Sequence, residues 1–169
     1  MLIYFGGKFS FRYKDYSDSK LGEDYRSVLI GVDSLKKEPA QLPKITDTVT
    51  YAGPFYFYEK EVSAEEIVAK EAKTVANADA CFFYLDKDSA QPGTVTEIVN
   101  AALHKKIIKI FYVSEKIDKG EPEREIKSPL WYPIMFARTV NNELTTVKEF
   151  PSPAKAIGAL INAVEEMKW

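Results

Sequence analysis

The sequence has very little cysteine and histidine, with one residue of each among 169. Cys81 has no partner for an intramolecular disulfide, so nothing argues for a secreted, disulfide-stabilised protein. Because Cys81 lies in an apolar run, we expect an inert buried thiol. A single histidine argues against most metal sites and against any chemistry that needs two imidazoles. His104 stands near the end of a predicted helix, where a cation favours the helix dipole, and is interpreted as structural.

Long apolar runs and an excess of one charge sign are also lacking. No segment approaches the roughly 20 apolar residues of a membrane span. Residues 1–7 lack the basic and apolar regions of a signal peptide. The formal net charge of -2 argues against a protein that binds nucleic acid through bulk positive charge. We therefore expect a single domain over residues 1–169 in the cytoplasm, with neither a membrane nor a nucleic-acid polymer as partner.

Aromatic residues, by contrast, are abundant and unevenly placed. Of 22 aromatic side chains, six fall between Tyr4 and Tyr16 and five between Tyr51 and Tyr58. A phenylalanine-rich core would spread aromatic residues more evenly through strands and helices. The clustering therefore favours a platform for a flat ligand in these two segments.

Short apolar runs alternate with helix-length patterns, which is typical of an α/β protein with a doubly wound, mostly parallel sheet of about five strands. Helices on both faces of the sheet make three layers. Strands are expected at Leu2–Phe5, Thr48–Ala52, Ala80–Leu85 and Lys106–Val113, with a further candidate at Tyr132–Ala137. Helices are expected at Leu21–Lys37, after a capping box at Ser63–Glu66, at Gly93–Lys105 and at Pro153–Met167.

Ligands of such sheets bind at the carboxyl ends of the strands. The sequence contains neither a Gly-x-x-x-x-Gly-Lys-Ser/Thr loop nor a Gly-x-Gly-x-x-Gly turn, so kinase-like and dinucleotide-binding interpretations lose their main support. Glu97 carries two interpretations. The spacing Thr94-x-x-Glu97 satisfies the capping-box formula, whereas a carboxylate near a helix start at this edge could attack an electrophilic sugar carbon. Asp79 opens the third strand, so spacing alone assigns it to the opposite edge, as the cap or terminus of the preceding helix.

Three segments resemble the nucleoside 2-deoxyribosyltransferase family over roughly residues 1–113. They are Ile3-Tyr4-Phe5-Gly6, Tyr51-Ala52-Gly53-Pro54-Phe55, and Ala76-Asn77-Ala78-Asp79-Ala80 running into Gly93-Thr94-Val95-Thr96-Glu97-Ile98. The resemblance implies a flavodoxin-like sheet and a double displacement at C1′ of a deoxyribonucleoside, with transfer of the deoxyribosyl group to another base. It implies no metal and no organic cofactor, a nucleoside, nucleotide or free base as partner, and a homo-oligomer.

The same resemblance assigns roles to individual residues. Glu97 resembles the nucleophile that forms a glycosyl-enzyme intermediate, Tyr4 the tyrosine that orients it, and Asp79 the carboxylate that handles a proton on the leaving base. Phe9 takes the place of an aromatic that stacks on the base. The resemblance extends substrate binding to Gly6, Phe9, Gly53, Phe55, Asp86, Gln91, Gly93 and Thr94. Gln91 departs from the family, which usually has an aspartate there, so sugar or 5′-group recognition is expected to differ.

Other functions remain open from the sequence. Water in place of a second base would make the protein a nucleoside or nucleotide N-hydrolase. Gln91 and an unmatched C-terminal third also leave room for a non-catalytic nucleotide-binding module. A flavin-binding protein would use the same strand ends, but no Ser/Thr-rich phosphate loop follows the first strand. The basic and aromatic segment Lys8–Lys14 could meet a phosphate or be a solvated loop.

Overall fold

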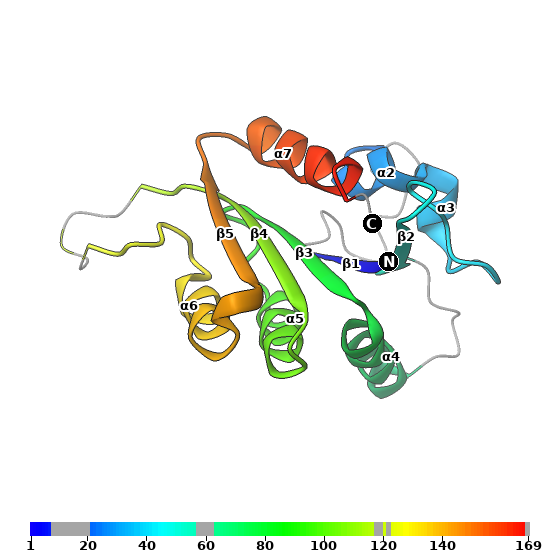
Figure 1. The fold of residues 1–169 in the computed structure, drawn as a ribbon, viewed down its shortest axis with the longest axis horizontal. Coiled ribbons are helices and arrows are strands. Elements are labelled where there is room, and N and C mark those ends of the chain that lie inside the picture. The colour runs from blue at the N-terminus through cyan, green and yellow to red at the C-terminus, as the bar shows by residue number, and fades with distance from the viewer. Residues whose placement is uncertain (8–20, 57–62, 117–119, 121–122, 168–169) are drawn as a thin grey trace.

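The fold is built on a five-stranded sheet in which every neighbouring pair of strands is parallel. The computed structural model describes residues 1–7, 21–56, 63–116, 120 and 123–167. The strand order is β2-β1-β3-β4-β5, which is the order of flavodoxin-like sheets and confirms the expected fold class (Figure 1). The strands are β1 (Leu2–Gly6), β2 (Thr50–Gly53), β3 (Ala80–Leu85), β4 (Ile107–Val113) and β5 (Thr145–Phe150).

Helices cover both faces of the sheet, as Figure 1 shows. One face carries α4 (Ala64–Asn77), α5 (Pro92–Leu103) and α6 (Trp131–Val140), with the short helix η2 (Asn142–Leu144) after α6. The other face carries α2 (Tyr25–Ile30), α3 (Val32–Lys36) and α7 (Pro153–Glu165). No helix in the described ranges is both long and apolar enough to cross a membrane.

Each face of the sheet has its own hydrophobic core, because successive strand residues point to opposite faces. Tyr4, Cys81 and Phe83 belong to the core under α4, α5 and α6. Phe5 and Phe82 belong to the core under α2, α3 and α7. The near-continuous apolar sequence of β3 follows from this arrangement, since a strand covered on both faces needs apolar residues at every position.

The N-terminal helical region differs from the sequence expectation. In place of one helix over Leu21–Lys37, the structure has α2 and α3, separated at Gly31. Gly31 has a φ of 78°, a left-handed conformation that favours glycine, and its N–H donates to the Ser27 carbonyl over 2.8 Å. The apolar spacing continued across the break, so periodicity alone did not reveal it.

The C-terminal third contains the other two corrections. The segment Tyr132–Ala137 is part of helix α6 and not a strand, because Pro133, Ile134 and Ala137 form a buried helical face. The fifth strand is instead β5, a polar edge strand in which exposed and half-buried residues nearly alternate. Its sequence, Thr-Thr-Val-Lys-Glu-Phe, has too few apolar residues to stand out as a strand. The expected capping box of α4 is confirmed, with Ser63 and Glu66 exchanging both hydrogen bonds.

Asn141 joins three elements at the end of α6. Its side-chain amide donates to the Lys106 carbonyl over 2.7 Å, and its own carbonyl accepts from the Thr145 hydroxyl over 2.7 Å. Asn141 is 5% exposed, whereas the adjacent Asn142 is exposed. Asn141 therefore fixes α6 against the starts of β4 and β5.

We predict that Asn141→Ala lowers the free energy of unfolding by about 1–3 kcal/mol, because the Lys106 carbonyl loses its amide partner. Asn142→Ala is the matched control and should change stability by less than about 0.5 kcal/mol. Urea unfolding followed by circular dichroism measures both. Equal effects of the two substitutions would contradict the role given to Asn141.

Candidate active site

Two glycines bring the end of β1 close to its neighbours. A Cβ on Gly6 would lie 2.2 Å from the Phe83 ring and 2.9 Å from Glu97 Oε2. Gly7 has a φ of +117°, and a Cβ there would lie 2.3 Å from the Tyr84 carbonyl oxygen. Neither position has room for a side chain, so the Gly-Gly pair allows the backbone to pass directly beside the Glu97 carboxylate.

The structure brings Tyr4 and Glu97 together, as the resemblance implied. Tyr4 lies on β1 and is fully buried, and its hydroxyl donates to Glu97 Oε1 over 2.7 Å. Burial and then the nearby charge of Glu97 raise the pKa of Tyr4 well above its ordinary value. The phenol therefore stays protonated and remains a hydrogen-bond donor to the carboxylate at neutral pH.

Glu97 does not cap its helix. The cap residue of α5 is Gln91 and the helix begins at Pro92, so Glu97 is the sixth helical residue and lies in the second turn. The capping-box interpretation of Thr94 and Glu97 is therefore wrong, and so is the expectation that Glu97 stands in the first turn. Pro92 at the first helical position is the signal that places the start three residues earlier than the capping formula.

The carboxyl group of Glu97 is enclosed although the residue as a whole is only half-buried. Burial is the largest cause that raises its pKa from 4.5 to about 7. The charge of Glu71 raises this pKa further, while the Tyr4 hydroxyl, the Arg26 charge and the Gly7 backbone N–H lower it. Oε2 is buried and has no hydrogen-bond partner among the described residues. Tyr4 thus satisfies one of the two carboxylate oxygens and leaves the other unpaired among the described residues.

A cavity of about 330 Å³, open to solvent, adjoins Tyr4. This volume includes open solvent, and the space within it that water-sized molecules can occupy is about 20 Å³, which is room for about one water molecule. Lys70 and Glu38 at this cavity form an ion pair. The cavity is lined by Tyr4, Glu38, Ala52, Gly53, Pro54, Phe55, Lys70, Glu71 and Thr74. Gly53 and Phe55, both expected to bind substrate, therefore lie at the cavity.

Glu71 is a site residue that the sequence interpretation missed. It lines the cavity with Tyr4 and is close enough for its charge to raise the pKa of Glu97. On α4, Glu71 is four residues after Ile67 and four before the buried Val75, so all three share one helical face. A carboxylate on the apolar side of this helix is the signal that the sequence offers for Glu71.

Asp79 is not brought to this site. It precedes β3 at the amino end of the sheet, where its Oδ2 accepts from the Leu2 N–H over 2.7 Å. Gly6 pairs with Phe83, so Asp79 lies four residues, or about 13 Å, back along β3 from the level of Gly6. The placement at the opposite edge that spacing predicted is correct, and the role implied by the resemblance has no geometric support.

Of the remaining expected substrate-binding residues, those that the structure describes do not line the cavity. Asp86 closes a turn by accepting from the Asp88 N–H, the Ser89 hydroxyl and the Tyr84 hydroxyl over 2.9–3.1 Å. Gln91 and Gly93 are exposed at the start of α5, and Thr94 is buried. Phe9 lies outside the described residues.

Core packing accounts for part of the aromatic clustering. Phe5 stacks on Tyr51 with ring centroids 5.4 Å apart, and Tyr51 meets Phe55 edge-on at 5.3 Å. Phe55 is the member of this group that also reaches the cavity. The described part of the chain holds no group of three or more histidine, cysteine or acidic side chains placed to hold a metal ion.

Comparison with solved structures shows a likeness of fold. No protein-family model matches the chain, and no curated protein matches it. A CMP N-glycosidase, BcmB, from Clostridium botulinum superposes with a TM-score of 0.51 at 12% sequence identity. The superposition covers 96% of this chain and 99% of that chain.

The raised pKa of Glu97 predicts a particular pH dependence of stability. Its folded-state value of about 7 lies above the ordinary 4.5. The protonated carboxyl therefore contributes stability that is complete below about pH 4.5 and is lost as pH rises through about 7, a change of about 3 kcal/mol. Glu97→Gln stays neutral at every pH. The free energy of unfolding of this variant minus that of the wild type should therefore be larger at pH 8 than at pH 5, by up to about 3 kcal/mol.

Urea unfolding at both pH values measures this difference. Glu123→Gln, which replaces an exposed glutamate, is the control and should leave the pH dependence of stability as in the wild type. A wild type whose stability relative to Glu97→Gln does not change between pH 5 and pH 8 would show that Glu97 has an ordinary pKa.

Proposed function

We propose that this protein cleaves the N-glycosidic bond of a (deoxy)nucleoside or nucleotide, with Glu97 as the nucleophile. The observation that carries the proposal is the enclosed Glu97 carboxylate, which has Oε1 held by Tyr4 and Oε2 without a partner in the described residues. Tyr4, which holds this carboxylate, lines a cavity together with a second carboxylate, Glu71. A structural neighbour named as a CMP N-glycosidase supports the proposal at the level of fold.

The proposed reaction begins when Glu97 Oε2 attacks C1′ of the sugar. The bond between C1′ and the base nitrogen breaks, and its electron pair leaves with the base. The developing oxocarbenium ion is stabilised by the adjacent carboxylate, which then traps it as a glycosyl ester. Burial serves this step, because a carboxylate stripped of water is a stronger nucleophile and its charge acts through a medium of low dielectric constant.

Glu71 is the group we assign to proton transfer with the base. It faces the same cavity as Tyr4, and it raises the pKa of Glu97, so the two carboxyl groups interact. A proton held by such a pair can pass to the departing base while Glu97 attacks in its charged form. In the second half of the reaction, Glu71 accepts a proton from whatever attacks the glycosyl ester.

The acceptor decides the overall reaction. A second base regenerates a nucleoside and gives deoxyribosyl transfer, which is the reaction that the resemblance to the nucleoside 2-deoxyribosyltransferases implies. Water gives hydrolysis, and the structural neighbour's name, CMP N-glycosidase, favours this second outcome. The solvent-open cavity is compatible with water as the acceptor.

Incubation with deoxyinosine plus adenine, and separately with CMP, tests the proposal. We expect base release or base exchange whose kcat/KM rises with pH through about 7, because the nucleophile must be ionised. Glu97→Gln should lower kcat by at least about 1,000-fold. Rapid quenching of the wild type and peptide mass spectrometry should find one glycosyl group on the peptide that contains Glu97.

Chromatography of the products separates the two acceptors, since transfer yields deoxyadenosine and hydrolysis yields free sugar. Glu123→Gln serves again as the matched control and should keep wild-type rates. The proposal fails if the wild type releases no base from any of these substrates, or if Glu97→Gln remains as active as the control.

A second comparison tests the assignment of the proton-transfer group. Glu71→Gln should lower kcat on the order of 100- to 10,000-fold for a poor leaving base, and less for a base that leaves without protonation. Asp79→Asn should keep kcat and affect only stability, since Asp79 bonds the Leu2 N–H at the far end of the sheet. The reverse pattern, an inactive Asp79→Asn and an active Glu71→Gln, would restore the role implied by the resemblance.

A further inference from the structure

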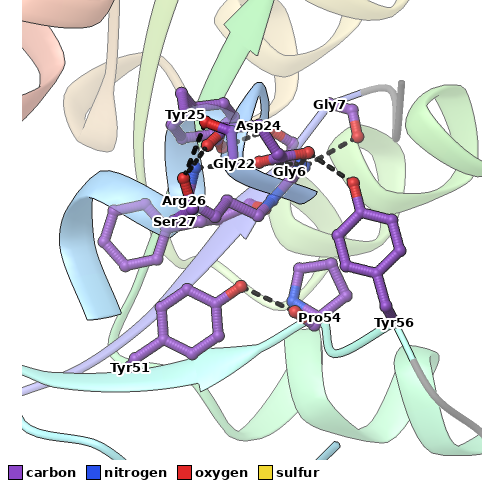
Figure 2. A network of polar contacts seen from close by, with 11 residues as sticks. Gly6, Gly7, Gly22, Asp24, Tyr25, Arg26, Ser27, Tyr51, Pro54 and Tyr56 are labelled. Atoms are coloured by element: carbon purple, nitrogen blue, oxygen red, sulfur yellow. Dashed lines mark hydrogen bonds and ion pairs between the residues drawn. The ribbon is translucent and has the colours of Figure 1, made fainter. Parts of the chain in front are cut away.

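The largest fully buried side chain is a charged one, Arg26 on α2. Its Nη1 bonds both oxygens of Asp24 over 3.0 and 3.2 Å. Asp24 is itself 3% exposed and caps α2 by accepting from the Arg26 N–H over 2.8 Å. The Tyr56 hydroxyl donates to the other Asp24 oxygen over 2.5 Å (Figure 2). A buried ion pair is costly unless its remaining donors and acceptors are satisfied, so the other contacts of Arg26 matter.

Two further hydrogen bonds of the Arg26 side chain go to the end of β1. Arg26 Nε donates to the Phe5 carbonyl and Nη2 donates to the Gly7 carbonyl, each over 2.8 Å. The carbonyl between them, that of Gly6, accepts from the Tyr25 hydroxyl over 2.9 Å. Three consecutive carbonyls at the carboxyl end of β1 are therefore held by two adjacent residues of one helix. Figure 2 shows Tyr25 and Arg26 beside Gly6 and Gly7.

The held segment is the one that touches Glu97. The Gly7 N–H and the Arg26 charge both favour the charged form of Glu97. Gly6 lies so close that a Cβ there would approach Glu97 Oε2 to 2.9 Å. Tyr4, which donates to Oε1, is the residue before Phe5. Arg26 does not line the cavity, so it acts on Glu97 through its charge and through the backbone that it holds.

We propose that Arg26 is a positioning residue for Glu97: by holding the Phe5 and Gly7 carbonyls, it fixes the Gly7 N–H and the Tyr4 hydroxyl beside the carboxylate. This inference rests on the proposed function only for its kinetic consequences. The geometric arrangement, and the ionisation of Glu97 that follows from it, exist whether or not the protein turns over a substrate.

Lysine in place of Arg26 separates charge from geometry. Lysine keeps the positive charge but lacks the planar fork that reaches two carbonyls and a carboxylate at once. Arg26→Lys should therefore loosen the end of β1. With the Gly7 N–H less well placed, the charged form of Glu97 loses stabilisation and its pKa rises above that of the wild type.

The experiment compares the wild type with Arg26→Lys, Tyr25→Phe, Tyr56→Phe and the control Tyr112→Phe. The tyrosine variants remove one hydroxyl each, so they test the same network if Arg26→Lys does not fold. Tyr112 also donates to a carboxylate, that of Glu149, but on β4 and β5, away from this network. Carboxyl-carbon NMR of glutamate labelled with ¹³C follows the ionisation of Glu97, with the signal assigned by Glu97→Gln.

Glu97 has charged or titratable neighbours on several elements, so the same titration must be compared across all variants. Groups that interact with it electrostatically come from β1, α2, α4 and β3 and are Tyr4, Tyr25, Arg26, Glu71 and Cys81. None of these except the substituted residue changes within the series. A shift confined to the network variants is therefore attributable to the network.

We expect the NMR midpoint of Glu97 to move to higher pH in Arg26→Lys and, by less, in Tyr25→Phe and Tyr56→Phe, while Tyr112→Phe keeps the wild-type value. The kcat for base release should fall on the order of 100-fold in Arg26→Lys, with KM within about threefold and the acid limb of the rate profile moved to higher pH. Folded network variants with the wild-type midpoint overturn the inference, even if they are less stable.

The two proposals fail separately. A wild type that releases no base removes the proposed function, and the midpoints still decide whether Arg26 positions Glu97. A wild type that releases base, together with network variants that keep its kcat and its acid limb, keeps the function and removes the positioning role.

Discussion

The buried ion pair between Arg26 and Asp24 is the interaction on which the rest of the structure depends. Desolvation of two charges is offset here by a nearly complete set of partners, since Arg26 Nε, Nη1 and Nη2 each donate a hydrogen bond. The pair joins β1, the short helix α2 and Tyr56, which follows β2. Helix α2 has only six residues and is too short to be stable alone. Its position, and that of the glycine turn after β1, therefore come from this pair rather than from helix propensity.

The same region contains a buried carboxylate, Glu97, whose desolvation lowers the stability of the fold. A buried Glu97 with one unpartnered oxygen is a poor way to fill a core, and leucine or glutamine would avoid the desolvation of a carboxylate. Tyr4 offsets part of the cost through its hydrogen bond, and the Arg26 charge and the Gly7 N–H offset more. What remains unsatisfied is a single buried oxygen, Oε2 of Glu97. A buried polar atom without a partner, surrounded by supporting contacts, is typical of functional sites.

Patterns in the sequence predicted the elements that a local repeat or motif defines. They missed the features that only tertiary contacts create. β3 was evident because a strand covered on both faces is apolar throughout, and the Ser63 capping box is a local exchange of hydrogen bonds. Tyr4 and Glu97 were found through motif resemblance. Glu71 was missed because its face of α4 is defined by what packs against it. Asp24 and Arg26 have the composition of an exposed helix start, and only burial gives them a role. β5 was missed because an edge strand need not be apolar.

Topology explains why the candidate site forms at this place. In the order β2-β1-β3-β4-β5, the connection from β1 runs over one face, through α2 and α3, and the connection to β3 runs over the other, through α4. The strand order reverses between β1 and β3, which leaves a crevice at their carboxyl ends. Tyr4 from β1 and Glu71 from α4 line the cavity, and Glu97 from α5 accepts a hydrogen bond from Tyr4. The fold thus fixes where these side chains meet. The chemistry at that location depends on a few side chains and on the contacts that hold them, of which the Arg26 contacts to β1 are the most extensive.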